Sequence, residues 1–245
     1  VSEKLTGKLA KLEALLAQVI KSGDSLAKSY ALQIQGDYLK PAVVLSKTYD
    51  AVVANPPYMG SKYHTPDVKK FLKSNFSDYD KDLFSAFIVR CLQMTKENGQ
   101  LGFMTPFVWM FISSYEDLRT KLINDETIST LIQLEYSGFD GATVPICTFT
   151  LTKGHIDSYK GCYVRLSDFK GAENQAPKTL EAIQNRDCGW FFEAKQDDFK
   201  KIPASPIAYW VSERVKNAFE NGVSLKSYAK PVVGLQTGDN ELFIK

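Results

Sequence analysis

The stretch YDAVVANPPYMG, residues 49–60, joins a short apolar run to a polar and aromatic turn. The small apolar residues 51–54 lead directly into this turn, which consists of Asn55, Pro56, Pro57 and Tyr58. An apolar run without polar alternation is typical of a parallel strand that is buried on both faces. In open α/β sheets, ligands bind beyond the carboxyl ends of the strands, and the turn falls at that place. The sequence therefore predicts a functional turn at the edge of an α/β sheet.

The segments on either side of this stretch alternate between helical and strand patterns. The spacing of apolar residues predicts helices over 3–21, 64–76, 80–100 and 113–125. Thr65 with Pro66 predicts the start of the second of these helices, and Ser113 with Glu116 predicts a capping box at the start of the fourth. Strand patterns cover three further segments after the quoted stretch and one before it: 30–39, 100–106, 127–137 and 144–153.

This alternation favours an α/β sheet with mostly parallel pairing over the first 155 residues. The segments 127–137 and 144–153 follow each other without a helix, so we expect them to form an antiparallel pair at an edge of the sheet. Beyond residue 155 the alternation loosens, and loop-like stretches such as FKGAENQAP appear. We therefore expect one domain over 1–155 and a second, incomplete module over 156–245.

Composition excludes several classes of protein. The 245 residues are 44% hydrophobic, which is enough for a sizeable core, and the net charge of +2 neither requires nor excludes a nucleic-acid partner. Four widely spaced cysteines and only two histidines predict neither a disulfide scaffold nor a metal site. No apolar run is long enough to span a bilayer, and the start does not resemble a signal peptide. We expect a soluble, cytoplasmic protein that does not contact a membrane.

The turn at 55–58 carries the chemistry that the sequence suggests. Two consecutive prolines make it rigid, because each fixes its φ angle and lacks an N–H donor. The turn then presents two oxygen acceptors, the Asn55 side chain and the Pro56 carbonyl, beside the flat face of Tyr58. Two acceptors that bind the hydrogens of a planar –NH2 group favour a pyramidal nitrogen, whose lone pair is then available for attack. Such fixed acceptors are an example of electrostatic preorganisation. An ordinary tight turn is the alternative, since these residue types are common in turns.

The sequence DAVVANPPY resembles the catalytic motif of the S-adenosylmethionine-dependent amino-methyltransferases, above all the adenine-N6 DNA methyltransferases. Further stretches extend the resemblance over most of the chain: NGQLGFMTPFVWMF, GFDGATVPICTFTL, SPIAYW and GLQTGDNELFIK. Together they are similar to the PglX family of methyltransferases from BREX phage-defence systems and to related type II restriction–modification methylases. The resemblance implies that a methyl group passes from S-adenosylmethionine to an adenine flipped out of double-stranded DNA. It also implies other subunits of a defence system as partners.

The resemblance assigns an architecture to the two expected parts of the chain. Residues 1–155 correspond to the C-terminal part of a Rossmann-like, S-adenosylmethionine-dependent catalytic domain. Residues 156–245 correspond to a linker and the beginning of a DNA target-recognition region. The glycine-rich turn that holds the methionine part of the cofactor in this family does not occur before Asn55. We therefore expect a fragment that begins after the first cofactor-binding strands and binds S-adenosylmethionine weakly or not at all by itself.

The resemblance also assigns roles to single residues. The turn 55–58 matches the catalytic motif, and Asp37, in QGDYL, resembles the acidic position that contacts the adenine of the cofactor. Phe139 resembles a second aromatic residue that packs with Tyr58 against the flipped base. Asp37 equally fits a solvated turn, and Phe139 fits a packed core position. Four lysines after the turn are candidates for DNA phosphate contacts and also fit a solvated helix face: Lys62, Lys69, Lys70 and Lys73.

Two other functions stay open at the level of sequence. The turn cannot distinguish the –NH2 group of adenine from that of an amide, so a methyltransferase acting on a protein glutamine or on an RNA base is one alternative. A catalytically idle DNA-binding fragment is the other. The stretch 190–210, which mixes aromatic residues with lysines, would supply its contact surface.

Overall fold

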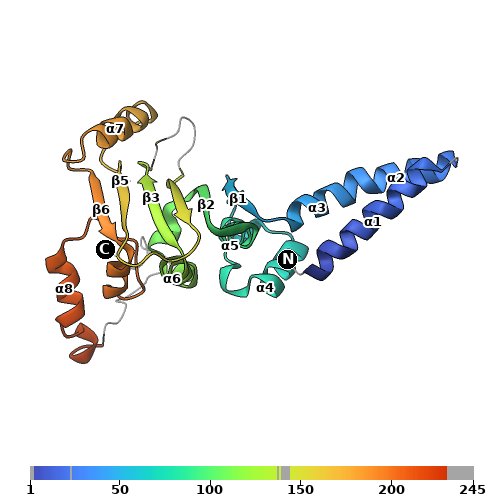
Figure 1. Ribbon diagram of the computed structural model, residues 1–245. Coiled ribbons are helices and arrows are strands. Elements are labelled where there is room, and N and C mark those ends of the chain that lie inside the picture. The colour runs from blue at the N-terminus through green and yellow to red at the C-terminus, as the bar shows by residue number, and fades with distance from the viewer. Residues whose placement is uncertain (1–2, 23, 137, 139–143, 231–245) are drawn as a thin grey trace, which may run out of the picture.

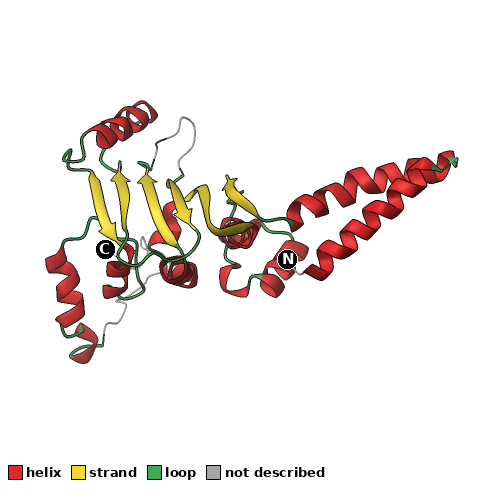
Figure 2. Ribbon diagram, in the orientation of Figure 1, coloured by secondary structure: helices red, strands yellow, loops and turns green. Residues whose placement is uncertain are grey.

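The computed structural model describes residues 3–22, 24–136, 138 and 144–230, and in them six strands form one sheet in the order β1-β2-β4-β3-β5-β6 (Figure 1, Figure 2). The strands are β1 (Tyr49–Ala54), β2 (Thr95–Pro106), β3 (Thr127–Gln133), β4 (Ile146–Thr152), β5 (Lys160–Arg165) and β6 (Phe191–Lys195). The helices are α1 (Glu3–Lys21), α2 (Ser25–Ile34), α3 (Lys40–Ser46), α4 (Pro66–Asn75), α5 (Leu83–Met94), α6 (Glu116–Asp125), α7 (Ala172–Gln184) and α8 (Glu213–Asn221). The α/β fold class is confirmed.

Parallel pairing is the minority in this sheet, so the expectation of a mostly parallel sheet is wrong. β1 pairs parallel with β2 and β3 parallel with β5, whereas β4 is antiparallel to both β2 and β3, and β6 is antiparallel to β5. β3 and β4 form the expected antiparallel pair, but β4 lies between β2 and β3 rather than at an edge. Parallel neighbours need a long crossover connection, usually a helix, and no helix separates β3 from β4 in the described residues.

A helical arm projects from the sheet beside β1 (Figure 1). α1 forms one side of the arm, and α2, a π-helical turn at Gln35–Leu39 and α3 form the other. The helix predicted over 3–21 is confirmed. The strand predicted over 30–39 is wrong, because this segment belongs to the second side of the arm.

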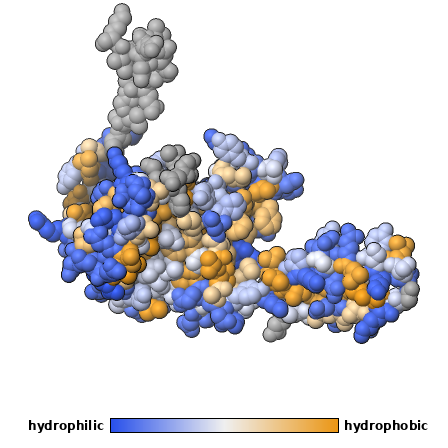
Figure 3. Space-filling view, turned by 90° about the horizontal axis from the view of Figure 1, so that it is seen from above, coloured by the Kyte–Doolittle hydropathy of each residue, from blue (hydrophilic) through white to orange (hydrophobic). Residues whose placement is uncertain are grey.

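Local contacts explain why residues 30–39 are helical. Asp24 precedes α2, and its carboxylate accepts the backbone N–H groups at the start of the helix. Ala31 and Leu39 pack against Leu16 of α1, so these two residues lie on the helical face that contacts α1. Other apolar side chains of the arm, such as Leu15 and Leu26, remain exposed, and apolar surface runs along the arm in Figure 3.

The main core packs α5 and α6 against the sheet. Phe84 and Ile88 of α5 and Leu118 and Leu122 of α6 lie in one buried cluster with Phe149 of β4. This confirms the predicted apolar face of the helix over 80–100, although the helix ends at Met94 and β2 begins directly after it. In the described residues, no helix is both long and apolar enough to cross a membrane.

One of the two predicted helix caps is present. The hydroxyl of Thr65 accepts the Val68 N–H at 3.4 Å, and Pro66 occupies the first turn of α4. The capping box at Ser113 and Glu116 is wrong. Residues Ser113–Tyr115 form a 3₁₀ turn and α6 begins at Glu116, so Ser113 stands too far from the helix to cap it.

The sheet continues beyond residue 155, where β5 and β6 complete it. The ring of Tyr209 stacks on Tyr163 of β5 with centroids 4.7 Å apart, and its hydroxyl donates to the Gln133 side chain of β3 at 2.9 Å. The Ile207 N–H donates to the Met110 carbonyl at 2.9 Å. The boundary at residue 155 stays a prediction, and any division there runs through one sheet and one core.

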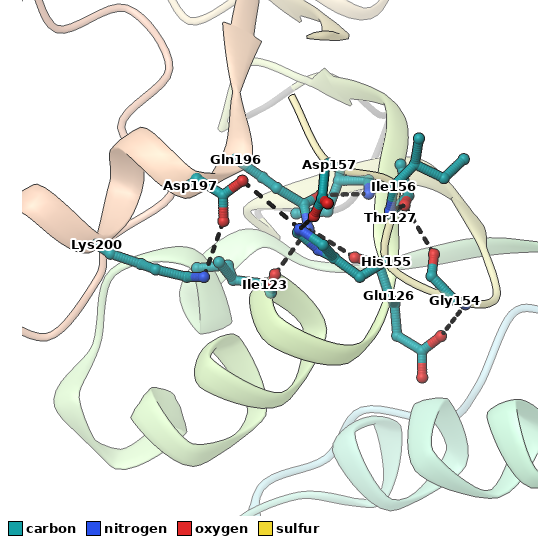
Figure 4. A network of polar contacts seen from close by, with 11 residues as sticks. Ile123, Glu126, Thr127, Gly154, His155, Ile156, Asp157, Gln196, Asp197 and Lys200 are labelled. Carbon is teal, nitrogen blue, oxygen red and sulfur yellow. Dashed lines mark hydrogen bonds and ion pairs between the residues drawn. The ribbon is translucent and has the colours of Figure 1, made fainter. Parts of the chain in front are cut away.

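A polar network ties the chain after β6 to the connection between α6 and β3 (Figure 4). The Gln196 side chain is 3% exposed; its oxygen accepts the Ile128 N–H, and its nitrogen donates to the carbonyls of Ile123 and Glu126. The same nitrogen lies 3.0 Å from Nδ1 of His155. A buried amide with its donors and acceptor engaged stabilises one packing arrangement. The network therefore fixes the segment after β6 against the end of α6 and the start of β3.

Candidate active site

The carboxyl ends of β1, β2, β3 and β5 meet at one edge of the sheet, because these four strands run in the same direction. The register places Ala54 opposite Phe103, and Gln133 opposite both Cys147 and Arg165. The 55–58 turn follows Ala54 at this edge. This is the edge at which open α/β sheets bind ligands, as expected from the sequence.

The four residues of the turn differ in exposure. Asn55 and Pro57 are exposed, Pro56 is buried, and Tyr58 is half-buried against the main core. In the described part of the chain, no hydrogen bond engages the Asn55 amide, so its oxygen is free to accept from a ligand. β1 itself is not buried on both faces as expected. It is an edge strand of the described sheet, and Val53 is 83% exposed.

Asp82 holds the backbone that follows the turn. Its carboxylate accepts the N–H groups of Met59 at 3.3 Å and Gly60 at 2.8 Å, and also that of Leu83 at 2.6 Å. Gly60 adopts a φ of 68°, a left-handed conformation that favours glycine. One buried carboxylate therefore caps α5 and fastens the loop after Tyr58 to the helix.

Two other polar side chains, those of His64 and Tyr115, lie near the Asp82 carboxylate. Nε2 of His64 lies 3.9 Å from the carboxylate, and neither buried nitrogen of this ring has a hydrogen-bond partner among the described residues. Tyr115 packs on Phe84 with centroids 5.2 Å apart. Burial raises the pKa of Tyr115 to about 12, and the charge of Asp82 adds to the shift, so the phenol stays neutral at physiological pH. Asp82 therefore holds this loop through its hydrogen bonds to the backbone N–H groups that follow the turn.

Sequence analysis missed Asp82, although a signal for it exists. An aspartate directly before the apolar run of a helix is a typical N-cap, and DKDLF at 80–84 fits this pattern. The cap alone does not predict the contact with Gly60, which lies 22 residues earlier in the chain.

Asp82→Ala is expected to lower the free energy of unfolding by about 2 kcal/mol, because a helix cap and two charge-assisted hydrogen bonds are lost. Any activity of the 55–58 turn should also fall, since the loop is released. Asp82→Asn is the matched control: it keeps a cap oxygen but has only one acceptor, so its stability should be closer to that of the wild type. Urea unfolding measures the effect, and wild-type stability of the alanine variant would contradict this role.

Comparison with known proteins agrees with this geometry. Residues 5–139, more than half of the chain, match the family model described as Eco57I restriction-modification methylase. The chain belongs to this family. The adenine-specific methyltransferase BrxX of Escherichia coli O9:H4 (strain HS) is 36% identical over 90% of this chain, and the adenine-specific methyltransferase PglX of Lacticaseibacillus casei (strain Zhang) is 33% identical over 82%. These alignments cover 19% and 17% of the two relatives, so the chain spans about a fifth of their length.

Solved structures share the fold at low sequence identity. A nuclease-deletion mutant of the Type ISP restriction–modification enzyme LlaGI, in complex with a DNA substrate mimic, matches with a TM-score of 0.54 and 13% identity, covering 82% of this chain and 18% of that one. A type I restriction–modification assembly matches with a TM-score of 0.52 and 12% identity, covering 75% of this chain and 41% of that one. The expected resemblance to restriction–modification and BREX methyltransferases is thus confirmed at the level of family and fold.

The other predicted site residues lie on the arm, on the loop and helix that follow the turn, or outside the described residues. Asp37 is exposed in the π-helical turn of the arm rather than at a strand end, and its contact with a cofactor stays a prediction. Phe139 lies outside the described residues. The four lysines predicted to face DNA are all exposed, on the loop after the turn and on α4: Lys62, Lys69, Lys70 and Lys73.

Proposed function

We propose that this chain is the catalytic part of an S-adenosylmethionine-dependent DNA adenine-N6 methyltransferase of a restriction–modification or BREX-type defence system. The observation that carries the proposal is the 55–58 turn at the carboxyl end of β1. There the Asn55 amide is exposed beside the half-buried ring of Tyr58, on a loop fastened by Asp82. Membership of the Eco57I family, with two adenine-specific methyltransferases among the relatives, supports the same chemistry.

The turn offers uncharged oxygen acceptors, which suit a substrate with an –NH2 group. Asn55 Oδ1 and the Pro56 carbonyl accept the two hydrogens of the exocyclic nitrogen of adenine, while the Tyr58 ring stacks on the base. These acceptors stabilise the positive charge that develops on that nitrogen. S-adenosylmethionine, when bound, would supply the electrophilic methyl group: the bond from sulfur to methyl would break as the bond from nitrogen to methyl forms, and S-adenosylhomocysteine would leave. The extra proton leaves for water afterwards, so the residues of the turn need not include a strong base.

A transfer assay with radioactive methyl groups tests this function. Double-stranded DNA, RNA and a glutamine-containing protein are offered separately to the chain alone and to the chain within a polypeptide of its relatives' length. We expect label in duplex DNA, on N6 of adenine after digestion to nucleosides, and mainly from the longer polypeptide. Label on RNA or protein would assign the alternative substrates. Salt-sensitive DNA binding without transfer, unchanged in Asn55→Ala, would assign the idle fragment.

Tyr58→Ala is expected to reduce kcat/KM for DNA about 5- to 150-fold, because stacking of one base on an aromatic ring contributes about 1–3 kcal/mol. Tyr58→Phe keeps the ring and should transfer at a rate close to that of the wild type. Steady-state kinetics on one duplex compares the two variants. An equal loss in both would assign the effect to the hydroxyl and contradict a stacking role.

A further inference from the structure

Arg165 lies at the same edge of the sheet as the 55–58 turn. It is the last residue of β5 and stands opposite Gln133 of β3 in the register. The strand order β1-β2-β4-β3-β5 separates it from the turn by four strand steps, or about 19 Å at the usual spacing between strands. Arg165 is therefore near enough to contact the substrate of the turn, provided that the substrate is long.

The guanidinium of Arg165 stacks on an aromatic ring and has no ionic partner among the described residues. It lies over the Trp210 ring, 4.6 Å from the centroid. Its buried Nε–H has no hydrogen-bond partner, and no carboxylate forms an ion pair with it, among the residues that the structure describes. By contrast, buried Arg119 donates to carbonyl oxygens, and Arg186, which stacks on Phe191, also pairs with a carboxylate. A buried, uncompensated donor is costly, so the charge of Arg165 favours an anionic ligand.

Half-buried aromatic residues connect Arg165 to the end of β2. Phe107 directly follows β2 and packs on Phe111 with centroids 6.3 Å apart, and Phe111 packs on Trp210 at 5.7 Å. We call Phe107, Phe111, Trp210 and Arg165 the edge strip. Tyr58 and the aromatic members of the strip all pack on the main core cluster, and the strip runs from the end of β2, the neighbour of β1, to a positive charge at the end of β5.

We propose that Arg165, oriented by Trp210, binds a backbone phosphate of the DNA whose adenine enters the 55–58 turn. This inference rests on the proposed function. A guanidinium stacked on an indole keeps its N–H fork in one plane, which matches the geometry of phosphate oxygens. For DNA that follows this edge, about 19 Å equals five to six base-pair rises of about 3.4 Å. The phosphate therefore belongs to a nucleotide that flanks the target, and Arg165 contributes to binding rather than to the transfer step.

The salt dependence of DNA binding tests the proposal. With the chain carried within a polypeptide of its relatives' length, the dissociation constant for a fluorescent duplex of mixed sequence is measured over a range of KCl concentrations for the wild type, Arg165→Ala and Arg165→Lys. We expect the slope of log K against log salt to become shallower by about 0.9 in Arg165→Ala, because one phosphate contact is lost. Arg165→Lys keeps the charge, so the slope should remain while the affinity falls.

Arg186→Ala is the matched control, because Arg186 also stacks on a ring but is already paired with Glu193. Its slope should equal that of the wild type. If Arg165→Ala does not fold in a thermal melt, Arg165→Gln, which keeps the length of the side chain without its charge, replaces it. An unchanged slope in the uncharged Arg165 variant overturns the phosphate contact alone. Failure of the wild type to bind duplex DNA overturns the proposed function and this inference together.

Discussion

Asn55→Ala is expected to abolish methyl transfer while leaving the fold intact. Removal of one preorganised group that stabilises charge in a transition state typically costs a factor of about 10²–10³ in rate, and Asn55 supplies one of the two acceptors proposed to bind the amine. Its side chain is exposed and has no hydrogen bond in the described part of the chain. The free energy of unfolding should therefore change by less than about 0.5 kcal/mol. Single-turnover transfer to duplex DNA and urea unfolding measure the two quantities.

Two further variants make this prediction specific to the acceptor. Asn55→Asp keeps a side-chain oxygen at the same place, so its rate should lie between those of the wild type and the alanine variant. Asn124→Ala removes an exposed asparagine of α6 far along the chain from the turn and should leave the rate unchanged. Normal transfer by Asn55→Ala would show that the turn is structural and would remove the basis of the proposed function.

Arg119→Met is expected to lower the free energy of unfolding by about 3–5 kcal/mol, because three carbonyl oxygens that contact this buried side chain lose their charged donor. The side chain is fully buried and donates from Nη1 to the carbonyls of Trp109 and Ile112 at 2.8 and 2.7 Å. Nε and Nη2 both donate to the Ala204 carbonyl. Burial lowers the pKa of Arg119 from its usual high value, and methionine replaces the stem without the donors.

The position of Arg119 explains why this effect should be large. Ala204 has a φ of 64°, a conformation that is unfavourable for alanine, so the bonds from Arg119 hold a strained segment. Arg119→Lys is the matched variant, because it keeps the charge but cannot reach three carbonyls in the same plane, and it should lose less stability. Urea denaturation of the three proteins gives the comparison. A loss of less than about 1 kcal/mol in Arg119→Met would show that the carbonyls find other donors.

Local signals predicted several features of the first 75 residues. The bounds of α1, the Thr65 cap and the strand–turn boundary at Asn55 each depend on residues within one or two helical turns or a single strand. Periodicity and capping act over such short distances, so a sequence displays them directly. The same reasoning failed for residues 30–39, where only the packing of Ala31 and Leu39 on α1 distinguishes a helix from a short strand.

The chemistry predicted for the turn depends on its own four residues, because two prolines, an amide and a phenol constrain that backbone and its donors wherever they occur. The contacts around the turn could not be predicted from the sequence, because they join residues that are distant in the chain. The Asp82–Gly60 clamp joins residues 22 apart, and the Arg119–Ala204 contact joins residues 85 apart. The insertion of β4 between β2 and β3, and the alignment of Arg165 with the turn, also arise from strand pairing. Such contacts form because the apolar faces of the helices and the sheet must pack together in one core. A short window of sequence does not specify which elements pack against one another.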